Sequence, residues 1–384
     1  MIDRRDVHSL ILQRLQDFRI VSILGPRQCG KTTIARQIAS ELDAPYFDLE
    51  RPDVRQRFAD PRVELESLRG VAVIDEVQLV PELFSTLRVL ADRTPLPCRF
   101  LLLGSASPEL VKGASQTLAG RVGFVPMGPF TIDEVGVERW RDLWIRGGFP
   151  LSMLARSATA SFDWRSAFVE TFIERALRSL GVNLPPMQVR RFWTMVAHYH
   201  GQTWNGAEIA GSMGFSQQSA RRYVDVLTHA FMLRQLPPWF ENAGKRIVKS
   251  PKVYVRDSGL LHALLGLGDY DAVASHPKLG ASFEGFCIEQ IIRHVGERNA
   301  YFWATHAGAE LDLLVNINGK KFGFEIKWTD TPKVTRSMNI ALADLNLDRL
   351  FVVHPGADSY PMGEKLRAVS LLALEETVKS IALA

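Results

Sequence analysis

One segment of the sequence has the glycine, lysine and hydroxyl spacing of a phosphate-binding loop. It matches G-x-x-x-x-G-K-(S/T) and runs through Gly25, Pro26, Arg27, Gln28, Cys29, Gly30, Lys31, Thr32 and Thr33. In such loops the glycines let backbone N–H groups surround phosphate oxygens, the lysine reaches the β and γ phosphates, and the hydroxyl binds Mg²⁺. An apolar run at residues 20–24 precedes the loop and a helical pattern at 32–42 follows it. The sequence therefore predicts that ATP and Mg²⁺ bind at this loop.

Two acidic residues stand at the end of a later apolar run. The run at residues 71–74 leads directly into Asp75 and Glu76. Burying a carboxylate beside a strand costs free energy, so acids at this position are expected to have a function. We expect Asp75 to hold Mg²⁺ and Glu76 to polarise the attacking water, which predicts hydrolysis and not binding alone. The alternative is that both acids begin a surface turn.

Ser105 and Arg121 are further candidates for phosphate chemistry. Ser105 follows the apolar run at 100–103 within Gly104-Ser105-Ala106-Ser107, where a small polar side chain can sense the γ-phosphate; the alternative is that it only shapes the turn. Arg121 follows Gly120 and is a candidate for stabilising transition-state charge in its own subunit or in a neighbour. The alternative for Arg121 is a surface arginine that caps a helix.

A helix, a tight turn and a second helix are predicted between residues 207 and 231. Gly214 marks the turn, Ser216 is a suitable N-cap, and the apolar positions of the second helix form one stripe. This leaves four polar side chains facing outward: Gln217, Gln218, Arg221 and Arg222. With the basic segment 245–252 as a wing, the pattern predicts DNA binding by a winged helix. Winged-helix units also serve as structural or dimerising modules, which is the alternative.

Acidic residues gather on two predicted strands near the C-terminus. Glu310 and Asp312 alternate with leucines on the first strand, and Glu325 and Lys327 alternate with apolar residues on the second. The pattern is similar to that of the PD-(D/E)xK nucleases, and the resemblance implies that Asp312 and Glu325 bind Mg²⁺ while Lys327 orients water. It also implies a helical acid, for which Glu284 is the candidate, and Glu310 is an alternative to either strand acid. Ordinary cross-strand ion pairs would produce the same local pattern.

Apolar runs and helical stretches divide the chain into four segments. Runs at 20–24, 46–49, 71–74, 100–103 and 124–127 alternate with helical patterns and predict a parallel α/β domain over 1–132. Aromatic-rich helical patterns around Gly147-Gly148-Phe149-Pro150 predict a helical lid or connector over 133–186. The winged helix is expected over 187–256, and mixed helix and strand signals over 257–384 predict an α/β nuclease-like domain.

The composition is typical of a folded protein. The chain has 384 residues, 46 % of them hydrophobic, with 46 Lys plus Arg against 42 Asp plus Glu and a net charge of +4. This mild basic excess permits a nucleic acid partner without requiring one. The three cysteines, Cys29, Cys98 and Cys287, form no C-x-x-C pair, and no apolar stretch is long enough to span a bilayer. We therefore expect a cytoplasmic protein with no membrane segment.

Taken together, these motifs resemble a widespread family of predicted prokaryotic ATPases. In that family an AAA+-type domain is fused to a C-terminal domain of unknown function. The resemblance rests on the loop, the strand at 71–78 with its acid pair, Gly104 to Ser107, Leu118-Ala119-Gly120-Arg121 and the Gly147 to Pro150 turn. The chain departs from the pattern at Cys29, where a small aliphatic residue is usual.

Three functions are compatible with the sequence. The first is an ATPase that couples nucleotide state to DNA binding by the winged helix and to metal-dependent DNA cleavage. The second is an ATP-switched DNA-binding scaffold or regulator whose nuclease-like domain is inactive. The third is a ring-forming DNA motor, a homo-oligomer in which Arg121 acts in trans. Intact Glu284, Asp312, Glu325 and Lys327 favour cleavage over the scaffold.

Overall fold

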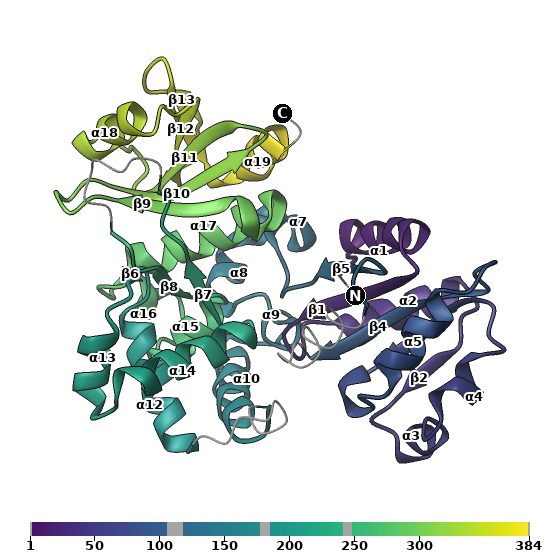
Figure 1. Ribbon diagram of the computed structural model, residues 1–384. Coiled ribbons are helices and arrows are strands. Elements are labelled where there is room, and N and C mark those ends of the chain that lie inside the picture. The colour runs from purple at the N-terminus through teal and green to yellow at the C-terminus, as the bar shows by residue number, and fades with distance from the viewer. Residues whose placement is uncertain (1, 106–117, 177–184, 241–247, 383–384) are drawn as a thin grey trace. The chain divides into compact units, whose positions relative to one another are not determined.

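The computed structural model describes residues 2–105, 118–176, 185–240 and 248–382, which form two compact units (Figure 1). The first unit is built on Met1–Phe130, and the second on Thr131–Arg175, Leu184–Thr228 and Met232–Ala384. Ala106 and Ser107 of the predicted sensor segment, and residues 245–247 of the predicted wing, lie outside the described residues. Within the described part, every helix is too short or too polar to cross a lipid bilayer.

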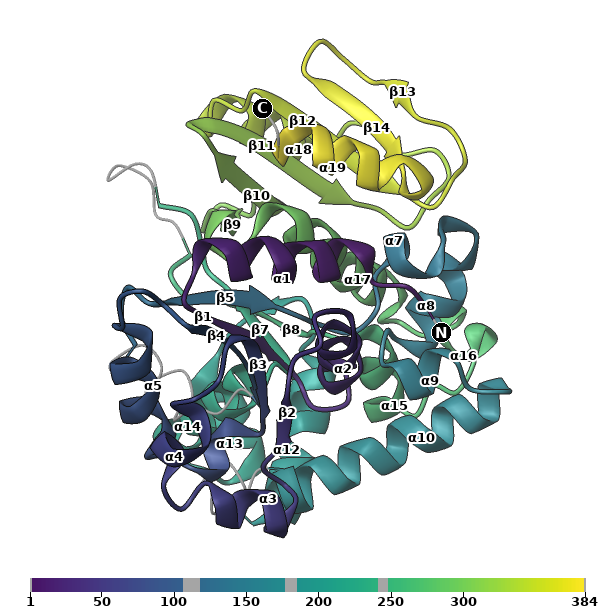
Figure 2. The ribbon, with the colours of Figure 1, turned by 90° about the vertical axis from the view of Figure 1, so that its right-hand side faces the viewer.

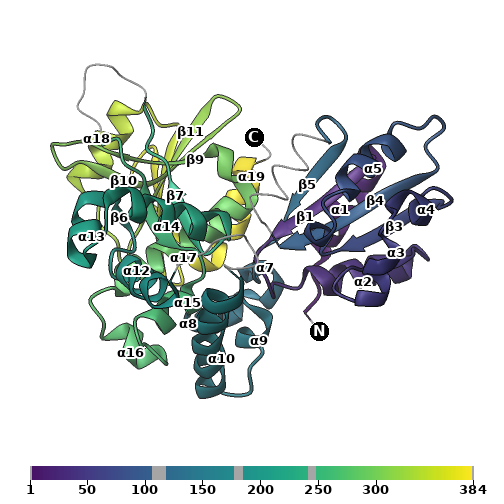
Figure 3. The ribbon, with the colours of Figure 1, turned by 60° about the horizontal axis from the view of Figure 1, so that its bottom comes forward.

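The first unit is a parallel five-stranded sheet with helices on both faces (Figure 3). Its strands are β1 (Ile20–Gly25), β2 (Tyr46–Asp48), β3 (Gly70–Asp75), β4 (Cys98–Ser105) and β5 (Val122–Pro126), in the order β2-β3-β4-β1-β5. Its helices are α1 (Arg5–Asp17), α2 (Lys31–Glu41), α3 (Pro52–Arg57), α4 (Pro61–Leu65) and α5 (Leu83–Ala91), with a short 3-10 turn at Val77–Leu79. The prediction of a parallel α/β domain is confirmed.

Alternating side chains of the central strands explain the two covered faces. On β4, Leu101 and Leu103 are buried in one apolar cluster with residues of α1 and α2, whereas Phe100 and Leu102 are buried in a second cluster with residues of α5. Strands buried on both faces read as continuous apolar runs, which is why these segments stand out in the sequence. Because the strands are parallel, β1, β4 and β3 end at the same edge of the sheet.

The second unit begins with short helices. They are α7 (Ile132–Val135), α8 (Trp140–Arg146), α9 (Pro150–Met153) and α10 (Ala158–Thr171), followed by a π-helix at Phe172–Ala176. Gly147 has φ of +74°, and a Cβ there would lie 2.2 Å from Asp257 Oδ1. The neighbouring Gly148 N–H donates to Asp257 Oδ2 at 2.8 Å, so this glycine pair joins α8 to the start of α15.

A three-stranded antiparallel sheet and three helices follow. The elements are α12 (Pro186–His198), β6 (Gln202–Thr203), α13 (Gly206–Met213), α14 (Gln217–His229), β7 (Leu233–Leu236) and β8 (Lys252–Val255), with β8 in the middle of the sheet. Gly214 adopts φ of +68° at the end of α13, as the tight turn requires.

The C-terminal part is a mixed six-stranded sheet with helices (Figure 2). Its helices are α15 (Ser258–Leu264), α16 (Tyr270–Ala274), α17 (Leu279–Val295), α18 (Arg336–Asp344) and α19 (Leu374–Ala382). Its strands are β9 (Ala300–Ala304), β10 (Glu310–Ile317), β11 (Lys320–Ile326), β12 (Arg349–His354), β13 (Tyr360–Pro361) and β14 (Leu366–Ser370), in the order β13-β14-β12-β11-β10-β9.

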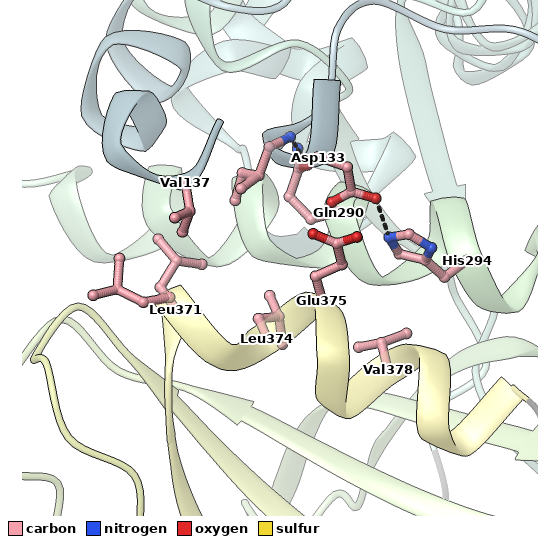
Figure 4. Close-up of a pocket in the computed structure, with 10 residues that line it drawn as sticks. Asp133, Val137, Gln290, His294, Leu371, Leu374, Glu375 and Val378 are labelled. Atoms are coloured by element: carbon pink, nitrogen blue, oxygen red, sulfur yellow. Dashed lines mark hydrogen bonds and ion pairs between the residues drawn. The ribbon is translucent and has the colours of Figure 1, made fainter. Parts of the chain in front are cut away.

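Residues of helix α7 contact α17 and line a small pocket together with α19, in the same unit (Figure 4). Asp133 Oδ2 lies 3.0 Å from Nε2 of His294 of α17, and the Ile132 N–H donates to Gln290 Oε1 at 3.0 Å. Apolar side chains of α19, including Leu374 and Val378, line the small pocket beside these contacts. Most residues of the segments predicted as lid, winged helix and nuclease-like domain belong to this one compact unit.

Candidate functional site

The predicted phosphate-binding loop connects β1 to α2 and needs glycine at two places. A Cβ on Gly25 would lie 1.8 Å from the carbonyl oxygen of Met127, so only glycine permits this close approach. Gly30 has φ of +99°, a conformation that side chains disfavour. Both glycines of the motif therefore have a local structural reason, and they place Lys31 at the first position of α2.

The ammonium of Lys31 is held against the loop itself. It donates to the carbonyl oxygens of Gly25 and Pro26 at 2.9 and 2.7 Å, and the side chain is largely buried. Among the described residues, no carboxylate forms an ion pair with this ammonium. A buried cation with only neutral partners is suited to receive an anionic group.

The side chains of the remaining loop residues differ in burial. Gln28 is exposed and has φ of +62°, Arg27 is half-buried, and Thr33 is exposed on α2. Cys29 is buried, and its carbonyl oxygen accepts from Arg4 Nη1 at 3.0 Å. The thiol of Cys29 therefore belongs to the apolar core, and its difference from the usual small aliphatic residue does not change the exposed surface of the loop.

Asp75 lies where β3 ends, beside the start of α2. Thr32 Oγ1 donates to Asp75 Oδ2 at 2.9 Å, and the hydroxyl of Tyr46 donates to the same oxygen at 2.5 Å. The Glu76 N–H donates to Asp75 Oδ1 at 2.9 Å. The structure thus brings together the two residues predicted to hold Mg²⁺, and their hydroxyl and carboxylate oxygens are ligands that Mg²⁺ prefers.

Sequence reasoning missed Tyr46, since no motif marks it. Tyr46 reaches Asp75 because β2 lies beside β3 in parallel, with Asp48 opposite Asp75. The Arg36 guanidinium lies 5.4 Å from the centre of the Tyr46 ring. Burial and the hydrogen bond to Asp75 raise the pKa of the Tyr46 hydroxyl, so it stays a donor to the carboxylate.

Glu76 has a backbone conformation that is rare for its residue type. Its φ and ψ are 56° and 44°, in the left-handed region, and its carboxylate accepts a hydrogen bond from the Gln78 side-chain amide. Strained backbone at a strand tip is common at functional sites. Burial raises the pKa of the Glu76 carboxyl, and the charge of Asp75 raises it further, despite the opposing hydrogen bond from Gln78.

Ser105 and Arg121 have different placements in the sheet. Ser105 pairs with Gly25 in the register of β4 and β1, which places its backbone next to the loop; its side chain lies outside the described residues. Arg121 precedes β5, at the opposite edge of the sheet, and forms two hydrogen bonds to the Asp92 carboxylate at 2.6 and 2.8 Å. The expectation that Arg121 acts in its own subunit is therefore wrong, and a role in a neighbouring subunit stays a prediction.

The second unit contains the acid cluster, which we define as Glu284, Glu310, Asp312 and Glu325. Strands β10 and β11 pair antiparallel with Leu313 opposite Phe324, and the Ile326 N–H donates to Asp312 Oδ2 at 2.9 Å. Asp312 and Glu325 are buried, Glu310 is half-buried, and Lys327 contacts Glu325 Oε1 at 2.7 Å. This pair therefore joins Glu325 of β11 to a residue just after the same strand and does not cross between two strands.

Lys252 supplies the cation at the centre of the acid cluster. The sequence suggests an exposed wing lysine that contacts DNA, but the structure shows otherwise, since only 3 % of Lys252 is exposed. Its ammonium lies 3.3 Å from Glu284 Oε1 and 3.7 Å from Asp312 Oδ1 and forms an ion pair with Glu310. Lys252 begins the central strand β8, and this position directs its side chain inward.

Two carboxyl groups of the cluster, those of Glu284 and Glu325, have a raised pKa. Burial raises the pKa of Glu284 and of Glu325 to about 7, and the charge of Asp312 adds to both shifts. For Lys252, burial lowers the ammonium pKa, but the surrounding negative groups outweigh burial and keep the ammonium charged. Among the described residues, no three His, Cys, Asp or Glu side chains are arranged to hold a metal ion.

The outer face of α14 is polar, as the sequence predicts. Gln217, Gln218, Arg221 and Arg222 are exposed, whereas Ala220 and Val224 are buried. Arg221 forms an ion pair with Asp225 at 3.2 Å on the same helix. Exposed pairs of this kind are weak, so both arginines are available to an external anion.

Three family models match consecutive parts of this chain. An AAA domain model matches residues 17–136, and models of two domains of unknown function, DUF8612 and DUF4143, match residues 137–271 and 279–374. The fold is similar to that of the Walker-type ATPase PABY2304 of Pyrococcus abyssi, with a TM-score of 0.51 and 14 % identity over 69 % of this chain and 96 % of that one.

Two mycobacterial proteins are similar over most of their length. The uncharacterized proteins Rv2008c of Mycobacterium tuberculosis and Mb2031c of Mycobacterium bovis are each 48 % identical over 369 residues, which is 96 % of this chain and 84 % of each relative. The chain therefore belongs to the family of these two proteins, with an AAA-type P-loop ATPase domain followed by a C-terminal domain of unknown function.

Proposed function

We propose that this protein hydrolyses ATP and uses the nucleotide state to control its binding to double-stranded DNA. The observation that carries the proposal is the meeting of Thr32, Asp75 and Lys31 at the ends of β1 and β3. An AAA-type domain supplies the ATP chemistry, and the exposed face of α14 supplies the DNA contact.

Each residue of the proposed ATP site in the first unit would have a separate role in hydrolysis. Lys31 would neutralise the terminal phosphates, and Thr32 and Asp75 would hold Mg²⁺, which supplies charge neutralisation when bound. Glu76 would accept a proton from the attacking water, because its partly buried carboxylate is a stronger base than an exposed one. Gln78 fixes the orientation of the Glu76 carboxylate through its amide.

Tyr46 would position Asp75 for the metal. We expect Tyr46→Phe to raise the Mg²⁺ concentration for half-maximal ATP hydrolysis by about 5-fold, since one hydrogen bond to a charged group contributes on the order of 1 kcal/mol or more. Titration of Mg²⁺ at saturating ATP measures this shift. Tyr301→Phe removes a hydroxyl that donates to the Arg298 carbonyl in the other unit and is the control. An unchanged Mg²⁺ requirement in Tyr46→Phe would remove Tyr46 from the site.

Helix α14 is the proposed DNA-reading helix. The segment α12 to β8 has the element order of a winged helix, with α13 and α14 joined by a tight turn and an antiparallel sheet alongside. Arginine and glutamine side chains on the exposed face suit phosphates and base edges. Because Lys252 is buried in the acid cluster, the wing contributes less positive charge to DNA than the sequence indicates.

The double variant Arg221→Ala, Arg222→Ala tests the proposed function. If both arginines contact phosphate, duplex affinity should fall and the log–log salt dependence should flatten by about two units, at ~0.9 per contact. Fluorescence anisotropy with labelled duplex, without nucleotide and with ADP or a non-hydrolysable ATP analogue, measures both the arginine effect and nucleotide control. Arg298→Ala, Arg349→Ala removes the same charge from exposed positions elsewhere. Equal affinity in the three nucleotide states, or an unchanged salt slope in the double variant, would contradict the proposal.

Metal-dependent DNA cleavage is a second candidate. The convergence of Glu284, Asp312 and Glu325 beside Lys327 favours it, because this is the residue set of the PD-(D/E)xK resemblance. The ammonium of Lys252 opposes it, since a cation already lies among these acids. The arrangement therefore supports the ATP-switched DNA-binding regulator better than the nuclease. Incubation of the protein with linear, nicked and branched DNA, Mg²⁺ or Mn²⁺, and ATP separates the two.

A further inference from the structure

We propose that the Lys252 ammonium takes the place of a divalent cation in the acid cluster, so that the cluster binds no Mg²⁺ or Mn²⁺ while Lys252 is present. The acid cluster consists of carboxylates from α17, β10 and β11, and their mutual repulsion must be offset by a positive charge. Lys252 provides that charge from β8, a strand of a different sheet.

The Lys252 ammonium lies within ion-pair distance of three carboxylates of the cluster. A lysine ammonium has three donors, and that of Lys252 faces three carboxylates, those of Glu284, Glu310 and Asp312. Glu284 Oε1 also accepts from the hydroxyl of Tyr254 at 2.6 Å. The ammonium thus binds the oxygens of Glu284 and Asp312 that a metal would need.

The position of Lys252 is determined by the pairing of its strand and by a contact of its side chain. Strand β8 lies between β6 and β7, and Lys252 pairs with Thr203 on one side and Leu236 on the other. Its ammonium also lies 5.8 Å from the centre of the Phe302 ring, a favourable distance for a cation–π contact. The position is therefore part of the folded core and not a transient surface contact.

One carboxylate oxygen of the cluster is left without a partner. Glu325 is 5 % exposed, its Oε1 contacts Lys327, and its Oε2 is buried with no hydrogen-bond partner among the described residues. Removing the Lys252 ammonium would leave Asp312 Oδ1 without this ion pair and Glu284 Oε1 with only the Tyr254 hydroxyl, beside the unpartnered Glu325 Oε2. Three carboxylate oxygens are a suitable ligand set for Mg²⁺ or Mn²⁺. With the Lys252 ammonium among these acids, no three His, Cys, Asp or Glu side chains of the described residues are arranged to hold a metal ion.

Mn²⁺ binding to the full chain without nucleotide tests the proposal. Free Mn²⁺, measured by electron paramagnetic resonance, should fall no further with the wild type than with Asp312→Asn. Lys252→Met keeps the length of the side chain without its charge and should bind about one additional Mn²⁺ per chain. The double variant Lys252→Met, Asp312→Asn should lose that ion. Lys320→Met, which removes an exposed lysine on β11, is the matched control and should behave as the wild type.

Two results would overturn the proposal. One is a wild-type Mn²⁺ site that Asp312→Asn abolishes, and this comparison holds whether or not the Lys252 variant folds. The other is a folded Lys252→Met protein, checked by circular dichroism, that binds no more Mn²⁺ than the wild type. Lys252→Arg keeps the positive charge and should also exclude Mn²⁺, so uptake by this variant at the level of Lys252→Met would overturn it too. Because metal binding alone is measured, the outcome is independent of ATP hydrolysis and DNA binding.

Discussion

ATP hydrolysis by the Lys31→Ala variant is expected to fall by at least about 100-fold. The buried ammonium has only the carbonyl oxygens of Gly25 and Pro26 as partners, and a bound triphosphate would replace these with charged oxygens. Hydrogen bonds to charged groups contribute roughly 1.5–3 kcal/mol each, so the loss of two of them corresponds to about two orders of magnitude or more. Phosphate release and ATP-analogue binding by calorimetry should both show the loss.

The control for this variant must separate lost chemistry from lost folding. Arg55→Ala removes an exposed cation from α3 of the same unit and should hydrolyse ATP at the wild-type rate. The thermal unfolding midpoint without nucleotide should change little in Lys31→Ala, because the apolar clusters on both faces of the sheet are untouched. Wild-type turnover in a folded Lys31→Ala protein would contradict the assignment of the loop.

The first unit could be predicted from the sequence because its signals are local. Each strand is buried on both faces, so each reads as an uninterrupted apolar run, and the glycines and lysine of the loop stand directly between a strand and a helix. The proximity of Thr32 to Asp75 follows from the shared direction of β1 and β3. The direction of β5 would likewise have placed Arg121 at the opposite edge, because this arginine precedes its strand.

Tyr46 and Lys252 could not be predicted in the same way, since their roles depend on contacts between distant segments. Tyr46 reaches Asp75 only because β2 pairs with β3. The sequence of a single strand does not indicate which strands will lie beside it in the sheet. Lys252 belongs to a basic stretch, and such stretches are usually exposed to solvent. The signal that distinguishes Lys252 is its place at the start of an apolar strand, Val253-Tyr254-Val255, in the middle of a sheet.

Replacing Glu76 with glutamine should reduce ATP hydrolysis by about 10²- to 10⁴-fold while ATP still binds. Glutamine keeps the size of the side chain and its contact with Gln78 but cannot accept a proton, and general base catalysis contributes an effect of this size. Bound ATP should therefore persist on Glu76→Gln, and a filter-binding assay with labelled ATP would detect it. Glu82→Gln, which changes an exposed acid of the same unit, is the matched control and should hydrolyse ATP normally.

The pH dependence distinguishes a base from a residue that only shapes the site. Only the ionised carboxylate of Glu76 can accept a proton, and burial places its pKa above the ordinary value of 4.5. The wild-type rate should therefore rise with pH through that pKa, and this rising limb should be absent from the residual rate of Glu76→Gln. If the variant loses ATP binding together with hydrolysis, Glu76 is needed for nucleotide binding and is not shown to accept a proton from the attacking water. If hydrolysis is slow but its pH profile matches that of the wild type, another group accepts the proton.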